Sequence, residues 1–194
     1  GWYHGVNGFF HLLNALLLFA CLRKLKLDAT AAGFVSAFFA FHPMAIEAVA
    51  WIAGRKDVLY TFFYFLSVYT YLLFREKKQN KYLVISVFLA WFSFLSKVSA
   101  ITLPAALLVC DLIYAKKINR TDWLTKIPYF IFSVIFGIIN ITGSTLVADK
   151  YTLPPTIMDK ILYSFMAFGL YVVKLFVPVG LTVIHSFPEK GTQE

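Results

Sequence analysis

The chain contains few charged residues and few cysteines. Only 14% of its 194 residues are Asp, Glu, Lys or Arg, whereas 60% are hydrophobic. A soluble domain of this length needs many more polar residues to cover its surface, so the composition excludes that class of protein. Cys21 and Cys110 both lie inside apolar stretches and indicate no disulfide framework.

The chain also lacks the short motifs that mark many soluble enzymes and metal proteins. It contains no glycine-rich nucleotide loop, no nucleophile elbow and no Cys/His spacing typical of a metal site. We therefore expect no metal centre and no tightly bound cofactor, and a role for a divalent metal is left open. The net charge of +8 is explained by short basic runs between apolar stretches, so we expect no nucleic-acid partner.

Long apolar runs recur along the whole chain. Each is close to the roughly 17 to 25 residues that cross the hydrocarbon core of a bilayer. The runs lack the alternation of barrel strands, so they should be helices that satisfy their own backbone hydrogen bonds. The sequence predicts an all-α integral membrane protein, a multi-span helical bundle with about six to seven membrane helices. This membrane domain should cover residues 1–188 and end in a frayed polar tail, 189–194.

The basic runs predict how the helices are oriented. They occupy residues 23–26, 75–81 and 116–120, and the positive-inside rule places all three on the cytoplasmic side. The opposite ends, near His42 and at residues 96–99, should then face the outer or lumenal side. The last apolar stretch, Ile161 to Val177, contains Lys174. It either spans the membrane or lies in the interface, and the buried charge favours the interface.

The richest polar segment is residues 41–57, at the predicted outer edge. Pro43 cannot continue a helix, so the second span should break at His42 and a short helix should follow to about Ala53. Gly54 fits a left-handed position, and Asp57 can cap the next span.

Two interpretations of this segment compete. In the first, it anchors the chain at the membrane interface, with Glu47 paired to Arg55 through helical spacing. In the second, it binds an anionic lipid phosphate. Arg55 and Lys56 would then donate hydrogen bonds to the phosphate, while His42 or Glu47 orients a substrate hydroxyl. Asp57 belongs to the same predicted binding set.

Two further cations are predicted on the same side, Lys97 and Lys174. Each alone is readily explained as a side chain that reaches from a helix end to the interface. Together with Arg55 they could surround a phosphate and neutralise the charge that develops on it as a leaving group.

Other polar residues have simpler explanations. The first span carries a stripe of polar residues with helical spacing, which should face the bundle and make interhelical hydrogen bonds. Asp111 lies near the cytoplasmic boundary and is expected to pair with Lys116 or Lys117. The stripe consists of His4, Asn7, His11 and Asn14.

Several polar and aromatic motifs follow one another in a fixed order along the chain. They are Tyr3-His4-Gly5-Val6-Asn7, Phe10-His11-Leu12-Leu13-Asn14, His42-Pro43, Glu47-Ala48-Val49-Ala50-Trp51, Gly54-Arg55 with Asp57, Leu95-Ser96-Lys97, Thr102-Leu103-Pro104 and Tyr171 to Pro178. In these motifs the chain resembles the membrane domain of the transmembrane and tetratricopeptide-repeat O-mannosyltransferases and their bacterial relatives, which belong to the GT-C class of glycosyltransferases.

This resemblance implies a membrane glycosyltransferase. Such enzymes move a sugar, mannose-like here, from a polyprenyl or dolichyl phosphate carrier to a hydroxyl of a protein or glycan acceptor. Transfer occurs at the outer face of the bacterial cytoplasmic membrane or the lumenal face of the endoplasmic reticulum membrane. The resemblance also implies that the first span, the first outer loop and its catalytic carboxylate precede Gly1, so this chain is expected to be a partial GT-C core that lacks the catalytic residue.

The chain departs from the family pattern at two positions. Ala45 and Val98 stand where relatives often have a histidine and an acidic residue. Two other classes of function also remain open. A transporter or flippase for a polar or lipid-linked solute would use the same broken helix, although the chain shows no internal inverted repeat and its charges sit at one edge. The third class is a structural membrane scaffold.

Overall fold

The structure, a computed structural model, describes residues 2–115, 120–148 and 157–178. These residues form helices and no strand. Three helices are long and apolar enough to cross a membrane, and a bent pair that breaks near His42 is a fourth candidate. The predicted all-α membrane class is confirmed, whereas helix length alone does not fix the number of spans. The three long helices are His4–Lys24, Arg55–Lys77 and Asp122–Gly143.

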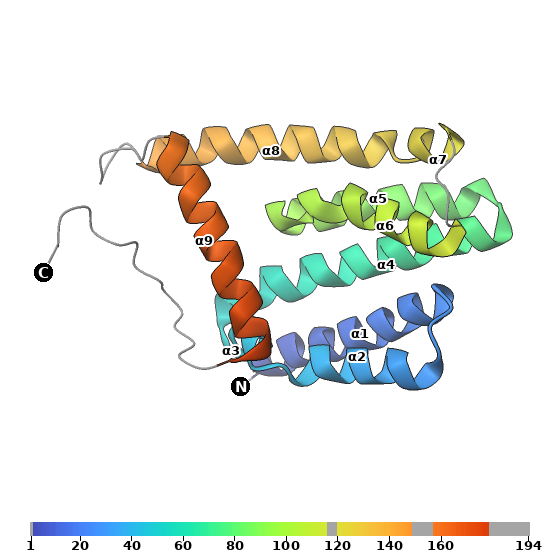
Figure 1. Ribbon diagram of the computed structural model, residues 1–194, viewed down its shortest axis with the longest axis horizontal. Coiled ribbons are helices and arrows are strands. Elements are labelled where there is room, and N and C mark those ends of the chain that lie inside the picture. The colour runs from blue at the N-terminus through green and yellow to red at the C-terminus, as the bar shows by residue number, and fades with distance from the viewer. Residues whose placement is uncertain (1, 116–119, 149–156, 179–194) are drawn as a thin grey trace, which may run out of the picture. The chain divides into compact units, whose positions relative to one another are not determined.

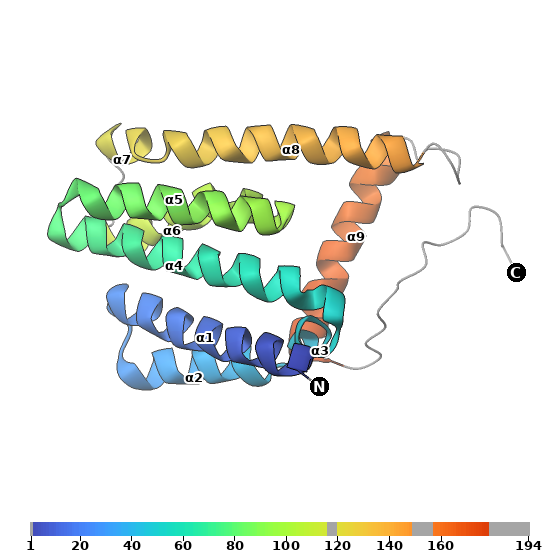
Figure 2. The same cartoon turned by 180° about the vertical axis from the view of Figure 1, so that it is seen from behind.

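The first two helices form an antiparallel hairpin. Helices α1 (Trp2–Lys24) and α2 (Ala29–Phe41) lie side by side in Figure 1 and Figure 2. Asp28 caps α2, because its carboxylate accepts a 2.7 Å hydrogen bond from the backbone N–H of Ala31. The predicted break then follows at His42, whose ψ of 131° is extended because Pro43 comes next.

Three short elements replace the single short helix that the sequence predicts after this break. They are the 3-10 turn η1 (Pro43–Ala45), helix α3 (Ile46–Ala50) and the 3-10 turn η2 (Ile52–Gly54). The chain bends by 50° between α2 and the segment Pro43–Ala50. Because α3 ends at Ala50, the four-residue spacing of Glu47, Trp51 and Arg55 does not correspond to one continuous helix face.

Gly54 serves a different purpose from the predicted one. It is not left-handed, since its φ is −67°, and it stands at the N-cap of the next helix, a position the sequence assigns to Asp57. A Cβ atom at Gly54 would lie 2.6 Å from the backbone oxygen of Ala48. Glycine is needed because η2 folds tightly back onto α3.

Two more hairpins follow in the bundle. Helix α4 (Arg55–Lys77) is followed by α5 (Asn80–Ser96), the 3-10 turn η3 (Val98–Thr102) and α6 (Leu103–Ala115). The predicted polar turn at residues 96–99 is confirmed. Small serines let α4 and α5 approach closely, since the hydroxyl of Ser67 donates to the backbone oxygen of Ser86 at 2.8 Å and that of Ser86 to the oxygen of Ser67 at 2.7 Å.

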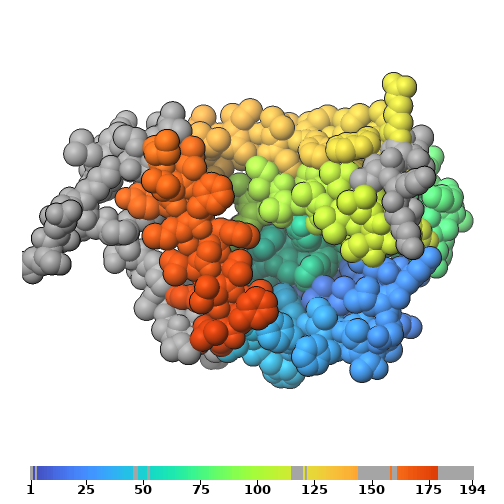
Figure 3. All heavy atoms as spheres, in the orientation of Figure 1, coloured from blue at the N-terminus to red at the C-terminus, as the bar shows by residue number. Residues whose placement is uncertain are grey.

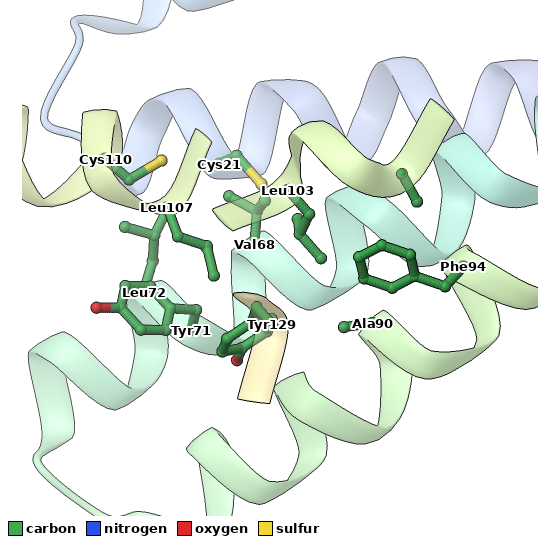
Figure 4. Packing of buried hydrophobic residues seen from close by; sticks show 11 residues of the cluster. Cys21, Val68, Tyr71, Leu72, Ala90, Phe94, Leu103, Leu107, Cys110 and Tyr129 are labelled. Atoms are coloured by element: carbon green, nitrogen blue, oxygen red, sulfur yellow. The ribbon is translucent and has the colours of Figure 1, made fainter. Parts of the chain in front are cut away.

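The last helices of this part are α7 (Arg120–Leu124) and α8 (Ile127–Ala148). Helices α5 and α6 lie between α4 and α8, and their side chains fill that space (Figure 3). Residues from α1, α4, α5, η3, α6 and α8 share one apolar cluster (Figure 4). Two of its aromatic side chains, Tyr71 and Tyr129, are fully buried with their rings in edge-to-face contact at 6.5 Å.

Helix α9 (Ile157–Phe176) belongs to a second compact unit, Pro154–Glu194, whereas all other helices belong to the first, Gly1–Leu153. It contains all but the last residue of the stretch Ile161 to Val177, for which a span and an interfacial helix are both open. Residues Ile161–Phe176 form an apolar helix shorter than the three long ones. The tail, 189–194, lies outside the described residues.

Candidate functional site

Lys97 and Asp57 form an ion pair at the end of the bundle where α4 begins. We call this region, residues 40–58 and 96–102, the Lys97 end. The Lys97 ammonium also lies 5.7 Å from the centroid of the Tyr60 ring, within reach of a cation–π interaction. The Lys97 and Asp57 side chains are 36% and 25% exposed, so the pair is accessible to a ligand.

Neighbouring hydrogen bonds fix the position of Lys97. Its extended backbone, with φ of −159°, joins α5 to η3. The hydroxyl of Ser93, one turn earlier, donates to the backbone oxygen of Tyr60 at 2.9 Å, and the hydroxyls of Tyr64 and Thr102 lie 3.3 Å apart. The turn that carries Lys97 is therefore attached to α4 on both sides.

Arg55 is the first residue of α4, on the same helical turn as Asp57. Its side chain is half-buried with a buried Nε atom, whereas Lys56 is exposed. The structure thus brings Arg55, Lys56, Asp57 and Lys97 to one end of the bundle. A carboxylate cannot donate to a phosphate, so Asp57 acts here on Lys97.

His42 is engaged in local structure. Its Nδ1 atom accepts a 3.2 Å hydrogen bond from the backbone N–H of Met44, and its ring centroid lies 4.8 Å from that of Phe38. This contact stabilises the turn after the break. Glu47 lies in α3, but its side chain is outside the described residues, so the predicted substrate roles of His42 and Glu47 remain predictions.

The polar stripe of α1 supports the broken segment. Side-chain nitrogens of Asn7 and Asn14 donate to the backbone oxygens of Trp51 at 3.1 Å and Val58 at 3.0 Å, and His11 Nε2 lies 3.0 Å from the oxygen of Ala40. The oxygen of Ala40 stands in the last turn of α2, so the contact with His11 satisfies a group that the break leaves open. The oxygen of Trp51 also accepts a 3.0 Å hydrogen bond from the backbone N–H of Gly54, so Asn7 adds a second contact to that turn.

His4 differs from the other three residues of the stripe. It is exposed, so the predicted bundle contact is wrong for this residue.

Lys174 lies in the last turn of α9, in the second unit, and its side chain is half-buried. The two units are described separately, so a shared site with Arg55 and Lys97 remains a prediction. Within the described residues, no group of three or more His, Cys, Asp or Glu side chains could hold a metal ion.

A second polar cluster lies at the opposite end of the first unit, and sequence reasoning missed it. Asp111 is fully buried and forms ion pairs with Lys126 and with Arg75, whose Nε lies 3.2 Å from Asp111 Oδ1. The expected partners, Lys116 and Lys117, lie outside the described residues. The only sequence signal was the polarity of these residues near the ends of apolar runs.

Comparisons with known proteins give the family. The model of the dolichyl-phosphate-mannose-protein mannosyltransferase family matches residues 9–143, more than half of the chain. The chain therefore belongs to this family of membrane glycosyltransferases. The matched region contains the Lys97 end and most of the first unit.

Named relatives agree with this assignment. Protein O-mannosyl-transferase Tmtc1 of Drosophila melanogaster is 29% identical over 157 residues, which cover 77% of this chain and 18% of the relative. Protein O-mannosyl-transferase TMTC1 of Mus musculus is 33% identical over 122 residues, 57% of this chain and 13% of the relative. The chain thus spans less than a fifth of these relatives. No solved structure matches.

Proposed function

We propose that the complete protein transfers a mannose-like sugar from a polyprenyl or dolichyl phosphate to an acceptor hydroxyl at the outer or lumenal face of a membrane. The observation that supports this most is the ordered, accessible Lys97, held by Asp57 and Tyr60 beside the start of α4. Family membership supplies the reaction class. In this proposal the Lys97 end is the half of the site that binds the carrier phosphate.

The chemistry explains why cations are needed there. Transfer breaks the bond between the sugar C1 and the phosphate oxygen, and the electron pair stays on that oxygen. The acceptor oxygen bonds to C1, and its proton passes to a general base, for which the family resemblance predicts a carboxylate. The departing carrier phosphate gains one negative charge, which Arg55 and Lys97 would neutralise.

The two cations suit different tasks. A guanidinium donates two parallel hydrogen bonds to a phosphate, so Arg55 would orient it. The Lys97 ammonium is a point charge whose position depends on Asp57. Some of its charge is already balanced by that carboxylate, so an arriving phosphate competes with Asp57 for Lys97.

The test is sugar transfer by the complete protein in proteoliposomes with a dolichyl-phosphate-linked mannose donor. We expect Arg55→Ala and Lys97→Ala to lower kcat/KM by about 10² or more, and Asp57→Asn to lower it less because Lys97 keeps its charge. Lys81→Ala, an exposed lysine at the first turn of α5, should not change it. Unchanged transfer in Arg55→Ala and Lys97→Ala would refute the site, and solute uptake without sugar transfer would favour a transporter.

A further inference from the structure

Five polar side chains are buried together at the end of the first unit opposite Lys97. Their side chains are 8% exposed or less, and Tyr71, Asp111 and Lys126 are fully buried. We call them the buried charge network. Its members are Tyr71, Arg75, Asp111, Asp122 and Lys126.

The network is charge-balanced and fully interconnected. Its two cations and two carboxylates form three ion pairs: Arg75 with Asp111, Arg75 with Asp122, and Lys126 with Asp111. The Tyr71 hydroxyl donates to Asp111 Oδ2 at 2.8 Å and accepts from Lys126 at 2.8 Å. Removing any one charge leaves an uncompensated charge in a water-poor interior, so the members depend on one another.

The members come from four segments of the bundle. Tyr71 and Arg75 lie one turn apart on α4, Asp111 lies on α6, Asp122 lies on α7, and Lys126 directly precedes α8. Lys126 also donates to the backbone oxygen of Asp122 at 2.8 Å, which closes the turn between α7 and α8. The network therefore attaches α6 and α8 to α4 at one end.

Helix α6 meets the Lys97 turn at its other end, and α8 contacts that turn along its first half. Helix α6 continues directly from η3, and the hydroxyl of Ser133 on α8 donates to the backbone oxygen of Ile101 in η3 at 3.2 Å. A Cβ atom at Gly137 of α8 would lie 3.1 Å from the Ile101 side chain, which shows how closely α8 and η3 pack. A shift of α6 or α8 on α4 would move η3 and Lys97 relative to Arg55.

We infer that the buried charge network is a positioning device for Lys97. It fixes α6 and α8 against α4 and so sets where Lys97 stands relative to the start of α4. Its members are positioning residues rather than catalytic ones, and their meaning for sugar transfer rests on the proposed function. Charge balance, more than any single side chain, maintains the position of Lys97.

The test measures that position directly. Spin labels are attached to Lys56→Cys and Ser99→Cys, two exposed positions at the start of α4 and in η3. Pulsed electron paramagnetic resonance in nanodiscs then measures the distance between the two labels. The buried Cys21 and Cys110 are replaced by Ala throughout. The variants Asp111→Asn and Lys126→Gln each unbalance the network, whereas the double variant restores balance and leaves the Arg75–Asp122 pair.

We expect each single variant to broaden or shift the 56–99 distance distribution and the double variant to restore it. If a single variant is not produced as folded protein while the double variant shows the native distance distribution, the inference is supported equally. Native distance distributions in both single variants overturn the inference, even if the melting temperatures of these variants are lower. The network would then stabilise its own end of the unit without affecting the position of Lys97. A double variant as disturbed as the single ones also overturns it.

Sugar transfer separates this inference from the proposed function. The single variants should lower kcat/KM for the lipid-linked donor by roughly tenfold or more, and the double variant should recover most of it, since misplacement of a binding group by about 1 Å is costly. If the wild-type protein transfers no sugar, the proposed function fails while the distance measurement still decides the inference.

Discussion

The two ends of the first unit use charge in opposite ways. At one end, Lys97 and Asp57 pair while 36% and 25% of their side chains remain exposed. At the other end, the side chains of Asp111 and Lys126 pair with none of their surface exposed. An accessible pair can exchange its partner for a ligand, whereas a buried and balanced pair cannot open without leaving a charge unsolvated.

The comparison shows that the presence of charge in a membrane bundle does not by itself mark a ligand site. Exposure and balance distinguish the two ends. The buried charge network connects α4, α6, α7 and the start of α8, so its role is to hold helices together. Lys97 stands on a short turn between α5 and α6, away from that network.

The largest expected effect comes from breaking the buried end. Lys126→Ala should lower the free energy of unfolding by about 3 to 5 kcal/mol, because it leaves Asp111 with one cation fewer in a buried site. Thermal unfolding of the protein in detergent measures this. Lys81→Ala, an exposed lysine at the same end, is the control. Equal melting temperatures for the two variants would show that the buried Lys126 contributes no more to stability than an exposed lysine.

A smaller effect is expected from the backbone of the Lys97 end. Gly54→Ala should destabilise by roughly 2 kcal/mol, because the added Cβ would meet the backbone of Ala48 and push η2 away from α3. Gly33→Ala is the matched control, since nothing lies within 4 Å of its Cβ position. The same melting experiment compares them, and a Gly54 variant as stable as the Gly33 variant would argue against the tight turn.

The polar stripe should contribute less still. Asn14→Ala removes the hydrogen bond to the oxygen of Val58 and should cost roughly 1 kcal/mol, the usual size of an interhelical hydrogen bond in a membrane. Leu12→Ala, at an exposed position of α1, should cost less. Hydrogen exchange at residues 55–62 would show whether the start of α4 loosens, and unchanged protection there would contradict the supporting role.

The exposed ion pair between Lys24 and Glu76 should contribute least. Their side chains are 30% and 46% exposed, so water solvates both partners once the pair is broken. Glu76→Gln should leave the melting temperature unchanged within error. A loss comparable to that of Lys126→Ala would show that exposure is the wrong criterion for sorting charges in this bundle.

Local sequence signals predicted the parts of the fold that depend on neighbouring residues. Pro43 dictated the break at His42, and the polar residues 96–99 indicated the turn between α5 and α6. Helical spacing placed Asn7, His11 and Asn14 on one face. Each of these rests on the backbone preferences of a few adjacent residues.

The buried charge network could not be predicted in this way. Asp111 pairs with Arg75 and Lys126, which are 36 and 15 positions away, so only the packing of α4, α6 and α8 brings them together. Nothing in the residues around Lys126 indicates that its ammonium is buried. The role of Gly54 was missed for the same reason, because the close approach of Ala48 arises only when η2 folds back.

The central claim is that the Lys97 end binds the carrier phosphate, and binding of dolichyl phosphate to the complete protein tests it most directly. Native mass spectrometry with wild type, Arg55→Ala and Lys97→Ala should show affinity for dolichyl phosphate at least about tenfold weaker in both variants, since each removes a charge-assisted contact. Affinity equal to wild type in both variants would contradict the claim.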